Sequence, residues 1–141
     1  MSHANTSVYI HANWAVKYRM ELLDQKTLEL LVEHIHQYAK TKNIILLAAG
    51  GYSDHFHSLI KLKSEQRLCD VIKFIKGESF FWLNNIRTTD GTFQWQTGYY
   101  AESICKSEVK RVIKYILNQQ QHHESRIRNG FNQPPFPFPQ T

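Results

Sequence analysis

Residues 44–62 constrain the fold of this chain more than any other stretch. Residues 44–49 are almost continuously apolar, which is typical of a central strand covered on both faces. Gly50 and Gly51 are expected to stop this strand, and a second strand follows that ends near Leu62. The two strands are expected to form a hairpin, which predicts antiparallel pairing in the sheet.

Three amphipathic helices are predicted around these strands. Asp24 is expected to cap a helix over residues 25–42, Ser64 caps a second helix that ends near Ile86, and a third begins at Ser107. Apolar residues recur in each at helical spacing. The inward side chains of the second helix are predicted to be Leu68, Val71, Ile72, Ile75, Phe81 and Trp82, and those of the third Val109, Val112, Ile113, Ile116 and Leu117.

Two further segments complete the pattern. Residues 8–16 partly alternate between apolar and polar side chains and are predicted to form the first strand. Residues 93–104 are predicted to form a short strand that bends at Gly98. Strand, helix, strand, strand, helix, strand and helix predict an α/β (α+β) sandwich with a central antiparallel sheet, in a ferredoxin-like arrangement. We expect one domain over residues 1–128, followed by a proline-rich tail over residues 129–141.

Charge and cysteine content narrow the functional classes. Lys and Arg number 17 against 12 Asp and Glu, and the net charge of +5 favours nucleic acid or an acidic membrane surface as partner. Cys69 and Cys105 lack metal-ligand spacing, which is typical of reduced thiols in a cytoplasmic protein. No stretch approaches the roughly 20 apolar residues of a membrane helix, and a signal-peptide pattern is absent. A cytoplasmic location is therefore expected.

The pair His55 and His57 is the sharpest chemical feature. Side chains at i and i+2 of a strand share a face, so the two imidazoles can bind one metal ion. This pattern alone does not decide whether the pair binds a metal ion, because a chain with 8 histidines can contain His-x-His by chance.

The last helix supplies complementary chemistry. At about 100° per residue, Arg111, Tyr115, Gln119 and His122 fall on one narrow stripe beside the apolar one. The Gln119 oxygen suits Mg²⁺ or Mn²⁺ as a third ligand, and the Tyr115 phenol can attack a phosphorus atom beside it. A partly buried tyrosine with polar neighbours in solvent explains the same stripe without any chemistry.

An ordered set of motifs makes a family resemblance specific. Asp54-His55-Phe56-His57, then Trp95-Gln96-Thr97-Gly98-Tyr99, then Tyr115-Ile116-Leu117-Asn118-Gln119 with His122-His123, resembles the single-tyrosine HUH transposases of bacterial insertion sequences. Lys17-Tyr18-Arg19 after the first strand also fits. The resemblance implies a metal-dependent DNA transposase that cleaves and rejoins single-stranded insertion-sequence ends, folded into hairpins, through a 5′-phosphotyrosine intermediate.

The resemblance also assigns roles to particular residues. His55 and His57 match the paired metal ligands, Gln119 the third ligand of the Mg²⁺ or Mn²⁺ ion, and Tyr115 the nucleophile. It further implies a homodimer in which the tyrosine helix of one subunit can complete the metal site of the other. The candidate phosphate contacts are Lys17, Arg19, Lys73, Lys76 and Arg111.

Three features depart from the family pattern. Ser53 stands where proline is usual, which should alter the turn more than the ligands. Tyr100 and Glu102 replace small and apolar residues, a change expected to affect hairpin recognition or local packing. Residues 129–141 stand where the family commonly carries a longer, structured extension.

Two other functions fit part of the pattern. A non-catalytic or repurposed relative would bind single-stranded nucleic acid through the same basic and aromatic surface. A small zinc-binding or metal-hydrolase domain would use His55 and His57 with His122 or His123.

Overall fold

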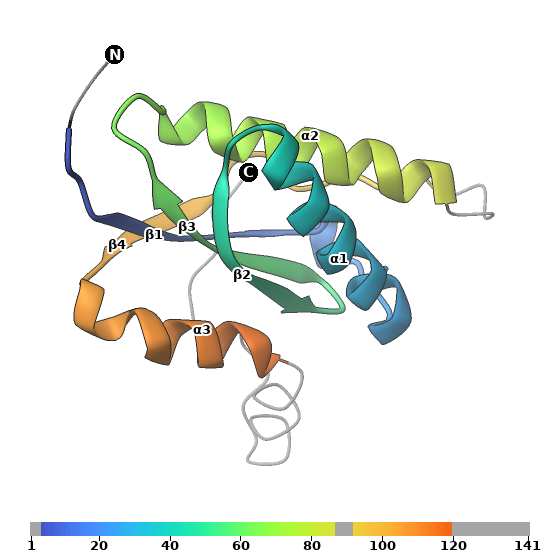
Figure 1. The fold of residues 1–141 in the computed structure, drawn as a ribbon. Helices are drawn as coiled ribbons and strands as arrows, with labels where there is room; N and C mark the ends of the chain where they lie inside the picture. The colour runs from blue at the N-terminus through green and yellow to red at the C-terminus, as the bar shows by residue number, and fades with distance from the viewer. Residues whose placement is uncertain (1–3, 87–91, 120–141) are drawn as a thin grey trace.

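A four-stranded antiparallel sheet separates two helical layers in the computed structural model, which describes residues 4–86 and 92–119 (Figure 1). Helices α1 and α2 lie on one side of the sheet and α3 on the other. The strands are β1 (Val8–Ala15), β2 (Ile45–Tyr52), β3 (His55–Leu62) and β4 (Tyr100–Ile104). The helices are α1 (Gln25–Thr41), α2 (Leu68–Ile86) and α3 (Val109–Leu117), with short 3₁₀ turns η1 (Lys17–Arg19) and η2 (Lys106–Glu108).

The strand order confirms the predicted ferredoxin-like arrangement. The sheet runs β2-β3-β1-β4, and each neighbouring pair is antiparallel. Ala12 of β1 lies opposite Ser58 of β3 on one side and Ala101 of β4 on the other. The predicted hairpin of β2 and β3 is also confirmed, with Tyr52 opposite His55 beside the turn.

The two faces of the sheet differ in what they bury. Because strand side chains alternate, Trp14 and Phe56 face α1 and α2, where they belong to the larger apolar core. The opposite face packs a smaller cluster under α3, formed by Tyr9, Ala48, Leu59, Val112 and Ile116. The candidate metal ligands His55 and His57 lie on this second face, so their imidazole rings lie beside the smaller apolar cluster.

The prediction for β2 was wrong in two respects. β2 is an edge strand, and its apolar character arises because α1 and α3 cover its two faces. The strand also runs through Gly50 and Gly51 rather than stopping there. A Cβ at Gly50 would lie 2.5 Å from the carbonyl oxygen of Ile116, and one at Gly51 would overlap the His55 carbonyl. These glycines therefore permit close packing instead of a turn.

The boundaries and faces of the last two helices also differ from expectation. Ser64 does not cap α2, because it lies in a turn where Gln66 accepts the Lys63 N–H and the helix begins only at Leu68. The buried stripe of α2 continues through Ser79 and Leu83, which leaves Phe81 63% exposed. In α3, which begins at Val109, Leu117 is likewise exposed because the buried stripe runs through Val112 and Ile116.

The segment before β4 is more irregular than the predicted bent strand. Only residues 100–104 form β4, and Gly98 has a φ of 87° in the bend that precedes it. Trp95 makes a single antiparallel bridge to Val16, and Phe93 is buried in the larger core.

Two segments discussed in the sequence analysis lie outside the described residues. The proline-rich tail over residues 129–141 lies outside them, as do His122 and His123.

Among the described helices, none combines the length and the apolar character needed to cross a membrane.

Candidate active site

His55 and His57 stand side by side beneath α3. They occupy alternate positions of β3, both are fully buried, and their ring centroids lie 5.1 Å apart. The strand periodicity thus brings the two imidazoles to one face, as expected from their spacing.

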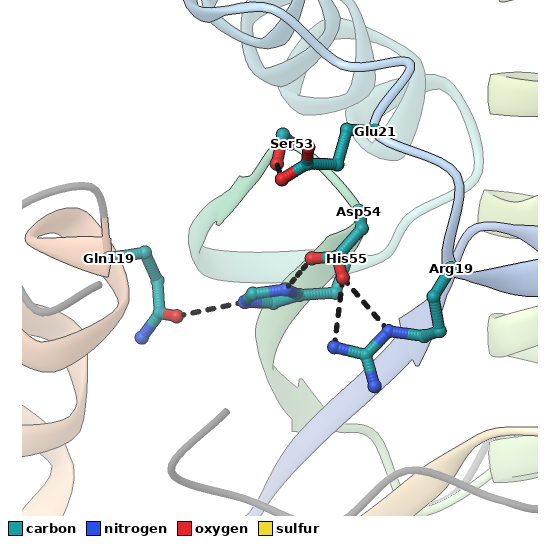
Figure 2. Close-up of polar contacts among 6 residues, drawn as sticks. All are labelled: Arg19, Glu21, Ser53, Asp54, His55 and Gln119. Atoms are coloured by element: carbon teal, nitrogen blue, oxygen red, sulfur yellow. Dashed lines mark hydrogen bonds and ion pairs between the residues drawn. The ribbon is translucent and has the colours of Figure 1, made fainter. Parts of the chain in front are cut away.

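The hydrogen bond of His55 to Asp54 defines the orientation of its ring. Nδ1 of His55 lies 2.7 Å from Oδ1 of Asp54, while Nε and Nη2 of Arg19 each lie 2.9 Å from the other carboxylate oxygen (Figure 2). Burial raises the pKa of Asp54, but the hydrogen bonds and charges of His55 and Arg19 outweigh it and hold that pKa below its ordinary value. Asp54 is therefore a carboxylate that accepts the Nδ1 proton of His55 and orients the imidazole ring.

Gln119 faces that nitrogen from just beyond the end of α3. Its Oε1 lies 3.1 Å from Nε2 of His55, and the side chain is buried (Figure 2). The amide Nε2 donates to the Tyr115 carbonyl oxygen at 3.3 Å, which assigns the amide oxygen to the histidine side. The amide oxygen of Gln119 and Nε2 of His55 therefore meet in a buried contact.

This geometry fits a divalent cation. Two ligands at right angles on an octahedral Mg²⁺ ion, with bonds of about 2.1 Å, lie about 3.0 Å apart. The 3.1 Å between His55 Nε2 and Gln119 Oε1 agrees with that spacing. Within residues 4–86 and 92–119 no three His, Cys, Asp or Glu side chains form a metal cluster, so any set of three donors here would have to include another residue type such as the Gln119 amide.

Tyr115 lies against the histidines rather than in solvent. Its ring centroid is 5.9 Å from that of His57 and 6.2 Å from that of His11, both in edge-to-face arrangements, and its hydroxyl oxygen is buried. The close packing of Ile116 over Gly50 positions this part of α3. The structure therefore brings together all four predicted residues, Tyr115, His55, His57 and Gln119, within one chain.

Sequence reasoning missed a second layer of polar residues on β1 and β4. Nε2 of His11 lies 2.8 Å from Nδ1 of His57, and Nδ1 of His11 lies 3.9 Å from Oε1 of Glu102. Burial lowers the pKa of His11 to about 4, so this ring is neutral at pH 7. Asn13 lies opposite His57 and is fully buried, and its amide has no hydrogen-bond partner among the described residues.

A signal for these residues was present in the alternation of β1. With Ile10, Ala12 and Trp14 on the apolar face, His11 and Asn13 necessarily face the other side of the sheet.

The departures from the family pattern leave the histidines in place. Ser53 donates to Oε1 of Glu21 at 3.0 Å (Figure 2). The Ser53 carbonyl also accepts the Leu23 N–H, so the turn before His55 is held to the segment before α1. Glu102 contributes a carboxylate beside His11, as described above.

The five candidate phosphate contacts fall into three groups. Arg19 holds Asp54, and Arg111 forms an exposed ion pair with Glu108. The other three, which are Lys17, Lys73 and Lys76, line one pocket at the α2 side of the sheet.

Comparison with known proteins assigns the family. The family described as "Transposase IS200 like" matches residues 4–119. The chain belongs to the IS200-like transposase family. That match spans the sheet, all three helices and the four candidate residues of the site.

Individual relatives agree with this assignment. The chain is 22% identical to the ISDra2 transposase TnpA of Deinococcus radiodurans over 122 residues, which cover 77% of this chain and 81% of the relative. A crystal structure of a Deinococcus radiodurans R1 protein assigned as a transposase has a TM-score of 0.67 at 21% identity, covering 84% of this chain and 95% of that one. A REP-associated tyrosine transposase bound to a REP hairpin has a TM-score of 0.61 at 13% identity, covering 97% and 92%. The two structures share the α+β fold of this IS200-like transposase.

Proposed function

We propose that this IS200-like transposase cleaves and rejoins single-stranded insertion-sequence ends through a 5′-phosphotyrosine intermediate. The observation that carries the proposal is the convergence of Tyr115, from α3, with His55 and His57, from β3, in one buried site. A phenol next to a set of metal ligands is suited to attack on a phosphodiester.

In this proposal His55, His57 and Gln119 hold a Mg²⁺ or Mn²⁺ ion. The approach of His55 Nε2 and Gln119 Oε1 to 3.1 Å supports this assignment. When bound, the ion would supply polarisation of the non-bridging oxygens of the scissile phosphate. Asp54 and Arg19 would orient the His55 ring through the hydrogen bond to Nδ1, so that Nε2 points toward Gln119.

Tyr115 acts as the nucleophile. Its phenolic oxygen loses its proton and forms a bond to phosphorus while the bond from phosphorus to the 3′ oxygen breaks, and that oxygen takes up a proton and leaves as a 3′-hydroxyl. A later attack by a 3′-hydroxyl on the phosphotyrosine reverses the exchange and joins two DNA segments. One phosphoester replaces another at each step, so joining requires neither ATP nor water.

The proposed substrate is single-stranded DNA that carries a hairpin. The REP-associated tyrosine transposase, which shares the fold, was solved bound to a REP hairpin, and the net charge of +5 suits a polyanion. We also propose a homodimer, as the family resemblance implies. In the described chain the tyrosine and the metal ligands come from the same subunit, which gives one of the two arrangements that such a dimer can use.

A covalent-trapping experiment tests the chemistry. The full chain is incubated with single-stranded hairpin DNA and Mg²⁺ or Mn²⁺, and a protein–DNA adduct is sought on a denaturing gel. We expect the adduct with the wild type and with Tyr38→Phe, a tyrosine of α1 away from the site, and its loss in Tyr115→Phe. An adduct that persists in Tyr115→Phe would exclude this tyrosine as the nucleophile. Salt-sensitive DNA binding without any wild-type adduct would instead support the non-catalytic alternative.

A further inference from the structure

We propose that a second pocket, lined by α2 and residues 94–99, binds an unpaired nucleotide of single-stranded DNA. The pocket has a volume of about 580 Å³, within the range of small-molecule sites in proteins. Its α2 wall includes Lys73, Gly77 and Phe80, which share one face of the helix at spacings of three, four and seven residues. Lys17 and Trp95 contribute from the other side.

The charge of the pocket favours an anion. Lys17, Lys73 and Lys76 all line it, whereas no Asp or Glu does. Lys17 donates to the amide oxygen of Gln94, and Lys76 donates to the carbonyl oxygens of Gln96 and Gly98, so neutral groups solvate both ammonium groups. A phosphate would find positive charge here that no lining carboxylate compensates.

Gly77 is an exposed residue of the pocket wall that leaves room for a ligand. Glycine in a helix interior destabilises the helix by about 0.5–1 kcal/mol relative to alanine, so it usually occurs where a neighbouring group leaves no room for a side chain. A Cβ at Gly77 would meet no atom within 4 Å, and therefore nothing in the described chain requires this glycine. Gly77 instead leaves space in the pocket wall where the backbone can approach a ligand closely.

The aromatic residues of the pocket suit a nucleobase. Phe80 is 41% exposed although it is a large apolar side chain, and it follows Gly77 by one helical turn. Trp95 and Tyr99 line the same pocket. Every base offers a flat face for stacking, so an aromatic wall with lysines around it binds single-stranded DNA with little dependence on sequence.

The position of the pocket connects it with the candidate active site. Ala15, the last residue of β1, lies opposite His55, and the N–H of Val16 donates to the Asp54 carbonyl oxygen at 2.8 Å. The next residue, Lys17, lines the pocket. The pocket therefore begins two residues along the chain from the strand position that lies opposite His55. The inference rests on the proposed function for the identity of the ligand.

Binding of a fluorescent oligothymidylate in EDTA, measured by anisotropy with the full chain, tests the pocket without cleavage. We expect Gly77→Leu, which fills the pocket, and Phe80→Ala, which removes the stacking surface, each to weaken binding about tenfold. Phe81→Ala is the matched control, because Phe81 is more exposed than Phe80 but does not line the pocket. Wild-type affinity in both pocket variants would overturn the proposal.

A second pair of variants tests the contribution of the lysine charges to DNA binding. Lys73→Gln is expected to reduce the slope of log K against log salt by about 0.7, the contribution of one phosphate contact with a single strand. Lys40→Gln removes an exposed lysine outside the pocket and should leave the slope unchanged. Equal slopes in the two variants would count against a phosphate at Lys73.

The two proposals fail separately. If the wild type forms no adduct but Gly77→Leu and Phe80→Ala lose oligothymidylate binding, the pocket is supported and the transposase chemistry is not. If the adduct forms while both variants bind as the wild type does, the pocket is excluded and the chemistry stands. Thermal unfolding of each variant checks the fold. If Gly77→Leu does not fold, the binding of oligothymidylate by Phe80→Ala tests the pocket.

Discussion

Gln119 and His55 meet across 64 residues of sequence, with the amide oxygen of one 3.1 Å from Nε2 of the other. The contact joins the end of α3 to the first residue of β3, and so connects the tyrosine-bearing helix with the proposed metal ligands. A divalent cation bound by both atoms would strengthen this connection.

Removal of the Gln119 amide should therefore weaken metal binding. We expect Gln119→Ala to lower the affinity for Mn²⁺ at least about tenfold, as loss of a group that holds or orients a metal usually does. Titration calorimetry of the full chain without DNA measures this directly. Gln25→Ala, at an exposed position of α1, serves as the control, and equal Mn²⁺ affinity in the two variants would exclude Gln119 as a ligand.

The carboxylate of Asp54 should matter through the orientation of His55. Asp54→Asn removes the charge that pairs with Arg19 and weakens the preference for a proton on Nδ1. We expect about a 10- to 100-fold loss of Mn²⁺ affinity, with the protein still folded. Asp70→Asn, which removes the charge of an exposed carboxylate in the first turn of α2, should bind Mn²⁺ as the wild type does.

Two glycines offer opposite outcomes for the same substitution. Gly50→Ala would place a Cβ 2.5 Å from the Ile116 carbonyl oxygen, and we expect it to destabilise the protein by about 1–3 kcal/mol. Gly77→Ala meets open space in the interior of α2 and should stabilise it by about 0.5–1 kcal/mol. Urea unfolding compares the two, and destabilisation by Gly77→Ala would show a packing role for that glycine.

His11 should make metal-free protein sensitive to mild acid. Burial lowers the pKa of His11 from 6.5 to about 4, so between these values the unfolded chain binds more protons than the native chain. The native state therefore loses stability as pH falls from 6.5 toward 4, by about 3 kcal/mol for this residue. Urea unfolding in EDTA across this range should give a smaller loss for His11→Gln. Identical pH profiles for the two proteins would contradict the assignment.

Local periodicity predicted much of the candidate site. The period of two in a strand placed His55 and His57 on one face, and the helical turn placed Tyr115 near Gln119. Neither rule reveals which strands are neighbours. The contact of His11 with His57 depends on the register of β1 against β3, 46 residues apart, so it became visible only in the assembled sheet.

The glycines show a second limit of sequence reasoning. Gly50 and Gly51 read as a stop signal because glycine commonly interrupts strands, yet β2 continues through both. Their role depends on Ile116 and His55, which approach from elsewhere in the chain. Similarly, β2 appeared central because it is apolar on both faces, whereas coverage by α1 and α3 gives an edge strand the same composition.

The division of the apolar residues between the two faces of the sheet gives α3 an unusual independence. The larger core, beneath α1 and α2, contains no residue of α3. Separation of α3 from the sheet would uncover the small cluster around Leu59 and Ile116 but would leave the larger core buried. In the proposed homodimer, exchange of α3 between subunits would therefore disturb the smaller cluster and leave the larger core of each subunit buried.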